Sequence, residues 1–149
     1  MTGMTVEAFN ELTRRELPLA TANGCHAEAI DADGTARVRL PFNDALIRPG
    51  GTISGPAMMA LTDYGMYAAL LGAIGDVALA VTTNLNINFL RKPEPTDMIA
   101  DCRVIKLGKR LAVLEVTIYS EGLDEPVAHA TGTYSIPPDT LPSGNGAST

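Results

Sequence analysis

The stretch RPGGTISGPAMMALTDYGMYAALLG, residues 48–72, holds a long apolar run with a single acidic side chain, Asp63. Pro56 stands near the start of the run, and proline suits a first helical turn because the N–H it lacks would be unpaired there. We therefore predict a helix from about residue 56 to 71. A helix that is apolar on all sides must be enclosed, and this one falls short of the ~20 residues that span a membrane. It is predicted to be a core helix.

The segments around this helix predict the rest of the fold. Thr5 caps a short amphipathic helix that ends at Pro18, and Asp33-Gly34 joins two strands as a hairpin. Residues 43–54 read as a loop. Four β-rich runs follow between residues 77 and 136, and their order suggests an antiparallel meander. One long central helix wrapped by a curved antiparallel sheet is an α+β architecture, the hotdog fold.

Length and composition limit the organisation and the function. We expect one domain over residues 1–137, with the N-terminal helix in residues 1–18 and a disordered Pro/Gly/Ser-rich tail over 138–149. The net charge of −6 and the pI of about 4.8 argue against nucleic acid and anionic membranes as partners. Cys25 and Cys102 lack metal-ligand spacing, so we expect two free thiols, no metal and a cytoplasmic location.

Asp63 is the first candidate for chemistry. Residues 59, 60, 66, 67 and 70 share its helix face, and none of them is basic. Burial of an unpaired carboxylate costs several kcal/mol. Either backbone or hydroxyl donors from the sheet hold Asp63 as a structural group, or a desolvated carboxylate of raised basicity lines a cleft as general base or nucleophile.

The helix start is the second candidate, because Gly55 can present an unpaired backbone N–H to a developing oxyanion. Gly55 and Asp63 are eight residues apart, about 12 Å along a helix, which is too far for both to act on one carbonyl. They could meet across two antiparallel helices of a dimer. The exposed edges of an antiparallel sheet also favour a homodimer. A homotetramer built as a dimer of dimers is a further alternative.

Other catalytic classes find little support. His26 and His129 stand in strands or at strand edges, where packing or surface roles are more common, and the sequence has no nucleophile elbow, P-loop or metal cluster. The basic groups of the last strands, Lys106, Lys109, Arg110, Arg91 and Lys92, are solvated charges or contacts for ligand phosphates.

Residues 42–136 resemble the PaaI-like acyl-CoA thioesterases of the hotdog superfamily. The resemblance is carried by the spacing of Gly51, Gly55 and Asp63 in RPGGTISGPAMMALTD, and by TTNLNINFLRKPEPTDMI further on. The chain departs from that pattern at Arg48, where the family has Asn, and at Ser54, where it has His. Pro56 replaces the second Gly of the family motif.

The resemblance implies that Asp63 is the base or nucleophile, that the Gly55 N–H binds the thioester oxygen and that Thr82 orients water. The family motif and the apolar residues that would line the substrate pocket also imply a set of substrate-binding positions. These are Arg48, Gly51, Ser54, Met59, Tyr67 and Thr83. The implied function is hydrolysis of an acyl-CoA thioester, with no cofactor besides the coenzyme A of the substrate. The alternative is an acyl-CoA-binding protein without turnover. A hydratase is disfavoured because that chemistry uses a His near the helix start.

Overall fold

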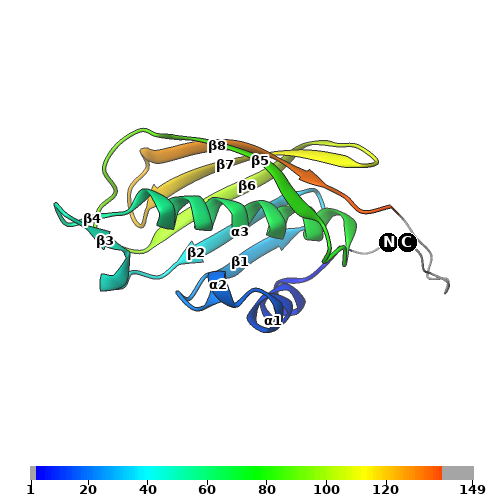
Figure 1. The fold of residues 1–149 in the computed structure, drawn as a ribbon, viewed down its shortest axis with the longest axis horizontal. Helices are drawn as coiled ribbons and strands as arrows, with labels where there is room; N and C mark the ends of the chain where they lie inside the picture. Colours follow the sequence, from blue (N-terminus) through cyan, green and yellow to red (C-terminus); the bar gives the residue numbers. More distant parts are fainter. Residues whose placement is uncertain (1–2, 139–149) are drawn as a thin grey trace.

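A curved antiparallel sheet of six strands forms one layer of the protein, seen in a computed structural model that describes residues 3–138 (Figure 1). The strand order is β1-β2-β6-β7-β8-β5. The strands are β1 (His26–Asp31), β2 (Thr35–Leu40), β5 (Val81–Phe89), β6 (Met98–Leu107), β7 (Leu111–Ser120) and β8 (Pro126–Ser135). The hairpin predicted at Asp33-Gly34 is confirmed: β1 pairs with β2, and Gly34 has the positive φ that the turn needs.

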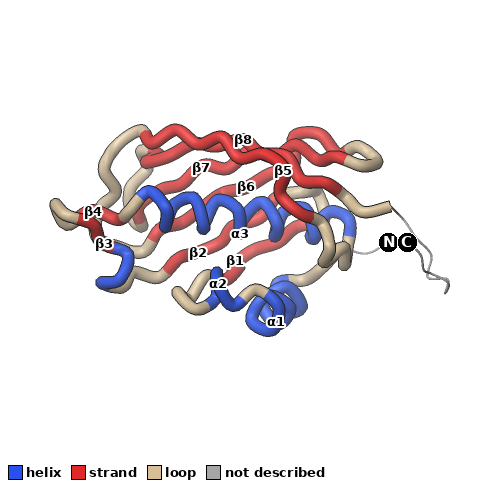
Figure 2. The backbone as a smooth tube through the Cα atoms, viewed as in Figure 1, coloured by secondary structure: helices blue, strands red, loops and turns tan. Residues whose placement is uncertain are grey.

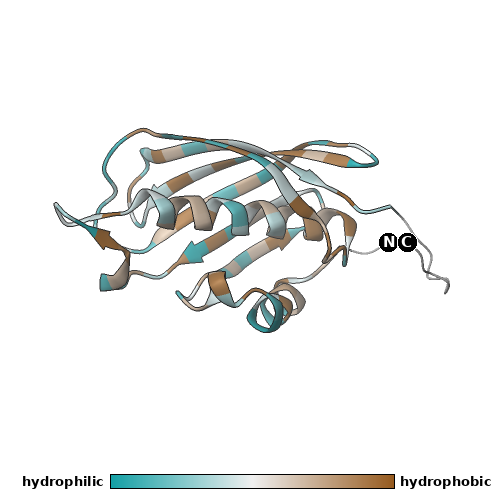
Figure 3. Ribbon diagram, viewed as in Figure 1, coloured by the Kyte–Doolittle hydropathy of each residue, from teal (hydrophilic) through white to brown (hydrophobic). Residues whose placement is uncertain are grey.

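Helix α3 (Gly55–Ile74) lies across the sheet and forms the second layer (Figures 1 and 2). It is predominantly apolar, as its colouring in Figure 3 shows. The helix is long enough to span a membrane, and an 18-residue stretch of it has a mean hydropathy of 1.3. However, 67% of that stretch is buried within the protein. The predicted core helix is therefore confirmed, with three residues more at its C-terminal end than expected.

Two glycines let α3 approach the sheet closely. A Cβ atom at Gly65 would overlap the Cys102 sulfur on β6, and one at Gly72 would overlap Ile30 on β1. Side chains on the inner face of the sheet pack against the helix, including Val38, Leu114 and Ile118. The helix and the inner face of the sheet thus form one continuous hydrophobic core.

Helix α1 (Val6–Glu16) packs at the β1 edge of the molecule, and the short helix α2 (Pro18–Thr21) follows it (Figure 1). The Thr5 side chain accepts a hydrogen bond from the Ala8 N–H, which confirms the predicted cap. Pro18 begins α2 rather than only ending α1. Phe9 of α1 is fully buried against Tyr64 and Tyr67 of α3.

Two sequence-based expectations about connectivity are wrong. The last four strands do not form a meander, because β5 pairs with β8 at the far edge while β6 pairs with β2. The segment between β5 and β6 therefore crosses from one edge of the sheet to its middle, which lets the sheet wrap α3 from both sides. Residues 43–54 also contain structure, a 3₁₀ turn η1 (Asp44–Leu46) and the hairpin of β3 (Ile47–Arg48) and β4 (Thr52–Ile53).

Enclosure of α3 is also less complete than predicted. Pro56, Met59 and Ala60 are exposed along one side of its first half. The predicted disordered tail lies, from residue 139 on, outside the described residues.

Candidate active site

The Asp63 carboxylate is held by two hydroxyl groups of the sheet. Thr82 of β5 donates to Asp63 Oδ1 at 2.5 Å, and the Tyr134 hydroxyl of β8 lies 2.9 Å from the same oxygen. Asp63 Oδ2 makes no hydrogen bond within residues 3–138. Every buried side-chain oxygen in that part of the chain has a hydrogen-bond partner. Because Oδ2 has none, it is not buried and is accessible to solvent. The carboxylate is thus fixed through one oxygen and free at the other.

A β-bulge in β5 brings Thr82 to this position. Thr82 is paired with Tyr134, but the register shifts between Thr82 and Asn84. Side chains alternate along a strand, so without the extra residue Thr82 would share a face with Asn84 and Asn86. With it, Thr82 lies on the same face as Leu85, towards α3. Thr83, the extra residue, instead donates its hydroxyl to the Thr133 carbonyl and is exposed.

Tyr134 is a site residue that the sequence analysis missed. It is 4% exposed, stacks on Tyr67 of α3 with ring centroids 6.1 Å apart, and its hydroxyl also lies 3.2 Å from the Asp63 carbonyl oxygen. Burial, together with the charge of Asp63, raises the pKa of the Tyr134 phenol well above its usual range. The available signal was the pattern Ala128, Ala130, Gly132, Tyr134, in which a hydroxyl follows small residues on one strand face.

The first turn of α3 presents a single free N–H group. The Ser54 side chain caps the helix by accepting from the Ala57 N–H, the Ser54 carbonyl accepts from Met58, and Pro56 has no N–H. Within the described residues the Gly55 N–H has no acceptor. Because the helix dipole adds partial positive charge there, this N–H is the natural donor to an oxyanion.

Phe89, at the end of β5, lies directly against Gly55. A Cβ atom at Gly55 would stand 3.3 Å from the Phe89 ring, and Phe89 itself is 49% exposed. The glycine therefore allows an aromatic side chain to sit beside the free N–H. Sequence reasoning did not find Phe89, because the register between a strand end and a helix start cannot be read from spacing.

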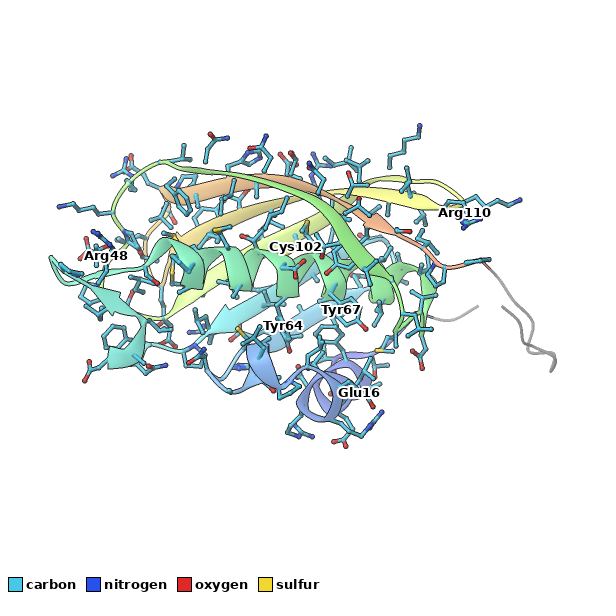
Figure 4. All side chains as sticks on the ribbon, viewed as in Figure 1. Glu16, Arg48, Tyr64, Tyr67, Cys102 and Arg110 are labelled. Atoms are coloured by element: carbon cyan, nitrogen blue, oxygen red, sulfur yellow. The ribbon has the colours of Figure 1, made fainter. Side chains whose placement is uncertain are left out.

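The remaining predicted positions lie around these two centres. Arg48 and Gly51 belong to the exposed β3–β4 hairpin that precedes α3, where Gly51 has φ +76°. Figure 4 places Arg48 at that end of the molecule, far from Arg110. Met59 is 41% exposed on α3 between Gly55 and Asp63. Tyr67 is buried and donates to the Ala78 carbonyl at 2.9 Å.

The structure brings Asp63 and Thr82 together but leaves Gly55 eight residues away on the same helix, about 12 Å. Both histidines are occupied elsewhere: His129 contacts Glu115 at 2.7 Å and His26 contacts the Gly24 carbonyl at 2.9 Å. No group of side chains suited to a metal ion occurs in residues 3–138. One carboxylate with two donors and one distant N–H are thus the chemical groups of the site.

Comparisons with known proteins identify the family to which the chain belongs. The Thioesterase superfamily profile matches residues 50–127, which contain α3 and both Asp63 and Thr82. A protein of Saccharolobus solfataricus assigned as an esterase is 32% identical over 89% of this chain and 86% of its own length.

Solved structures with a similar fold also include proteins assigned as thioesterases. A protein of Silicibacter sp. TM1040 assigned as a thioesterase is 38% identical, with a TM-score of 0.83 over 93% of this chain and 95% of that chain. A phenylacetic acid degradation-related protein of Ralstonia eutropha, also assigned as a thioesterase, is 25% identical, with a TM-score of 0.74 over 86% of this chain and 98% of that one. The chain belongs to the thioesterase superfamily, has its hotdog fold and resembles PaaI-related members, and this membership supports thioester hydrolysis as its general activity.

Proposed function

We propose that this protein is an acyl-CoA thioesterase that works as a homodimer with shared active sites. The observation that carries the proposal is the Asp63 carboxylate, fixed through Oδ1 by Thr82 and Tyr134 and open to solvent at Oδ2. Because Oδ2 is not buried, it needs no partner from the protein and is left for water or substrate. An oxygen that is oriented and left free suits attack on, or proton removal for attack on, an electrophilic carbon.

The dimer follows from the distance between the two halves of the site. Asp63 and Gly55 cannot both serve one carbonyl within a protomer, but two antiparallel α3 helices can place Asp63 opposite Gly55 of the partner subunit. Two observations support this arrangement. The side of α3 between them is exposed and apolar, at Pro56, Met59 and Ala60, and β5 is an edge strand with unpaired backbone groups.

Hydrolysis in this site proceeds in two stages. Asp63 Oδ2 either removes a proton from water or attacks the thioester carbon itself, and Gly55 N–H of the partner subunit stabilises the resulting oxyanion. In the first route Thr82 holds the water as an acceptor, since its one hydroxyl proton is donated to Asp63. Collapse of the tetrahedral intermediate in this route releases the free acid and the coenzyme A thiolate, which takes the proton from Asp63. In the second route collapse releases the thiolate and leaves an acyl anhydride on Asp63, which water cleaves to the free acid and the Asp63 carboxylate. Neither route requires a cofactor.

The activity test is thiol release from a panel of aryl-, short-, medium- and long-chain acyl-CoA thioesters. We expect turnover by the wild type and a loss of about a thousandfold or more in kcat for Asp63→Asn, the scale of removing a catalytic acid or base. Asp124→Asn, at an exposed turn, makes the same chemical change away from the site and should keep full activity. Binding of acyl-CoA without turnover by the wild type would instead identify a binding protein.

The shared site has its own test by subunit mixing. Gly55→Val would push a side chain against Phe89 beside the oxyanion donor, so this protein and Asp63→Asn should each be inactive as homodimers. A heterodimer of the two has one site with both wild-type groups. Random reassociation of an equal mixture should therefore restore about a quarter of wild-type activity, from half of the dimers with one intact site of two. No recovery in a mixture shown to contain heterodimers would refute a site shared between Asp63 of one protomer and Gly55 of the other.

A further inference from the structure

Tyr134 has a role in the site that the spacing of motif residues does not reveal. Its hydroxyl faces two acceptors on Asp63, the carboxylate Oδ1 at 2.9 Å and the backbone carbonyl oxygen at 3.2 Å. A phenolate there would be repelled by both oxygens, because no proton would be present to form a hydrogen bond. The hydroxyl is therefore a donor, and it bonds the reactive residue through both its side chain and its main chain.

We infer that Tyr134 is a positioning residue, which holds Asp63 Oδ1 so that Oδ2 faces the substrate; the inference rests on the proposed function. Thr82 alone would leave the carboxylate free to turn about its Cβ–Cγ bond, because one hydrogen bond does not fix a plane. Two donors arriving at the same oxygen from neighbouring strands do fix it, since Thr82 and Tyr134 are paired across β5 and β8. The rotation that would exchange Oδ1 and Oδ2 then breaks both bonds.

Tyr134 is itself held rigidly. It is almost fully buried and its ring stacks on Tyr67 at an interplanar angle of 23°, while the Tyr67 hydroxyl is anchored on the Ala78 carbonyl. A donor on a rigid support imposes its geometry on the group it binds, at little further entropic cost.

The phenol also keeps its proton through the working pH range. The titratable groups near the Asp63 carboxylate are Tyr134, which contacts it, and Tyr67, which stacks on Tyr134. Burial raises the pKa of both phenols, and the charge of Asp63 adds to the rise at Tyr134. Neither phenol changes charge between about pH 4 and 8, so neither contributes to the acid limb of the pH–rate profile.

The test compares Tyr134→Phe with Tyr64→Phe. Tyr64 is the next residue after Asp63, is equally buried, and shares its hydroxyl with Thr13 at 3.0 Å on the side facing α1, where Figure 4 shows it. Each variant removes one buried hydroxyl, so a purely structural role predicts similar effects. We expect Tyr134→Phe to lower kcat about tenfold or more with little change in KM, and to move the acid limb of the pH–rate profile to higher pH. Tyr64→Phe should do neither.

The direction of the pH shift follows from the hydrogen bond. A donor stabilises the ionised carboxylate, so its removal requires a higher pH to ionise the same group. Equal loss of kcat in both variants, with the acid limb unmoved in Tyr134→Phe, would overturn the inference. If Tyr134→Phe does not fold, 3-fluorotyrosine at position 134 keeps the hydroxyl as a stronger donor and should move the acid limb to lower pH; an unmoved limb would again overturn it.

Carboxyl ¹³C NMR of Asp63 separates this inference from the proposed function, because it needs no substrate. The Asp63 titration should move to higher pH in Tyr134→Phe relative to the wild type and to Tyr64→Phe. A wild type without thioesterase activity but with this shift would refute the proposed function and keep the hydrogen bond. An active wild type without the shift would refute the positioning role alone.

Discussion

In its first half, from Gly55 to Asp63, helix α3 leaves Pro56, Met59 and Ala60 exposed, whereas from Tyr64 to Gly72 every residue is buried. The exposed residues of the first half are themselves apolar or proline, although that half also holds Thr62 and Asp63. The halves differ in what lies against them: the second half fits between α1 and the sheet, while one side of the first half faces solvent. Composition thus predicts that a helix is apolar but not which part of it is covered.

Asp63 stands at the boundary between the halves. It is close enough to the core for Thr82 and Tyr134 to reach it, and close enough to the open side for Oδ2 to remain accessible. A carboxylate one turn further along would be fully enclosed, and one turn earlier it would lose the two donors. The boundary position is what leaves the group oriented on one side and open on the other.

The largest expected effect separates the two halves by stability. Met66, fully buried in the second half, and Met59, in the first, allow the same substitution in both environments. Met66→Ala should cost about 2–5 kcal/mol of unfolding free energy, because it leaves a cavity under the helix. Met59→Ala should change the stability of the isolated protomer by less than about 0.5 kcal/mol. Urea denaturation at low protein concentration measures both, and equal losses would contradict the comparison.

The next effect tests what covers the first half. If α3 meets α3 of a partner subunit there, Met59→Glu buries an unpaired charge in the interface and should raise the dimer dissociation constant about a hundredfold, near 3 kcal/mol. Leu123→Glu makes a comparable change at the β7–β8 turn, where the side chain is 51% exposed, and should leave the dimer intact. Sedimentation over a concentration series measures the constant. A dimer unaffected by Met59→Glu would have to use another surface.

A smaller effect is expected where the second half touches the sheet. A Cβ atom at Gly132 of β8 would lie 2.5 Å from the Met66 sulfur and 2.9 Å from the Asn84 carbonyl oxygen. Met66 can turn aside, but the backbone oxygen on β5 cannot, so Gly132→Ala should cost about 1–3 kcal/mol by overpacking. Because Asn84 adjoins the bulge that orients Thr82, kcat should fall as well. A stable variant of full activity would show that β5 can shift without disturbing Thr82.

Much of this fold was predictable from the sequence. The period-2 alternation of residues 84–89, the Asp33-Gly34 turn and the all-apolar helix each predict their element from local physics. Strand order was not predictable from the sequence. The alternation of apolar and polar residues along each strand is the same whether the four strands form a meander or β5 pairs with β8 at the edge of the sheet. The hairpin within residues 43–54 was missed because its strands are two residues long.

The site divides in the same way. Asp63 and Gly55 could be chosen as candidates because one charge in an apolar helix and a Gly-Pro helix start are local signals, and the resemblance to the family suggested Thr82. Tyr134 and Phe89 could not, since each depends on the strand register across the sheet. The bulge in β5 is the reason for Thr82. Simple alternation along the strand would place Thr82 on the same face as Asn84, and the extra residue of the bulge turns it to the opposite face.

The last expected effect concerns the labelling rate of the thiols. Cys102 lies beneath Gly65 in the second half of α3, and Cys25 is buried just before β1. Burial raises the pKa of Cys25 to about 11 and that of Cys102 further, so neither forms the reactive thiolate at pH 8. The native protein should therefore react with DTNB at least about a thousandfold more slowly than the unfolded chain, which should give two thiols. Met66→Ala should speed modification of Cys102 before that of Cys25, because opening of the second half uncovers Cys102. Rapid labelling of Cys102 in the wild type would show that this half is not the stable part of the helix.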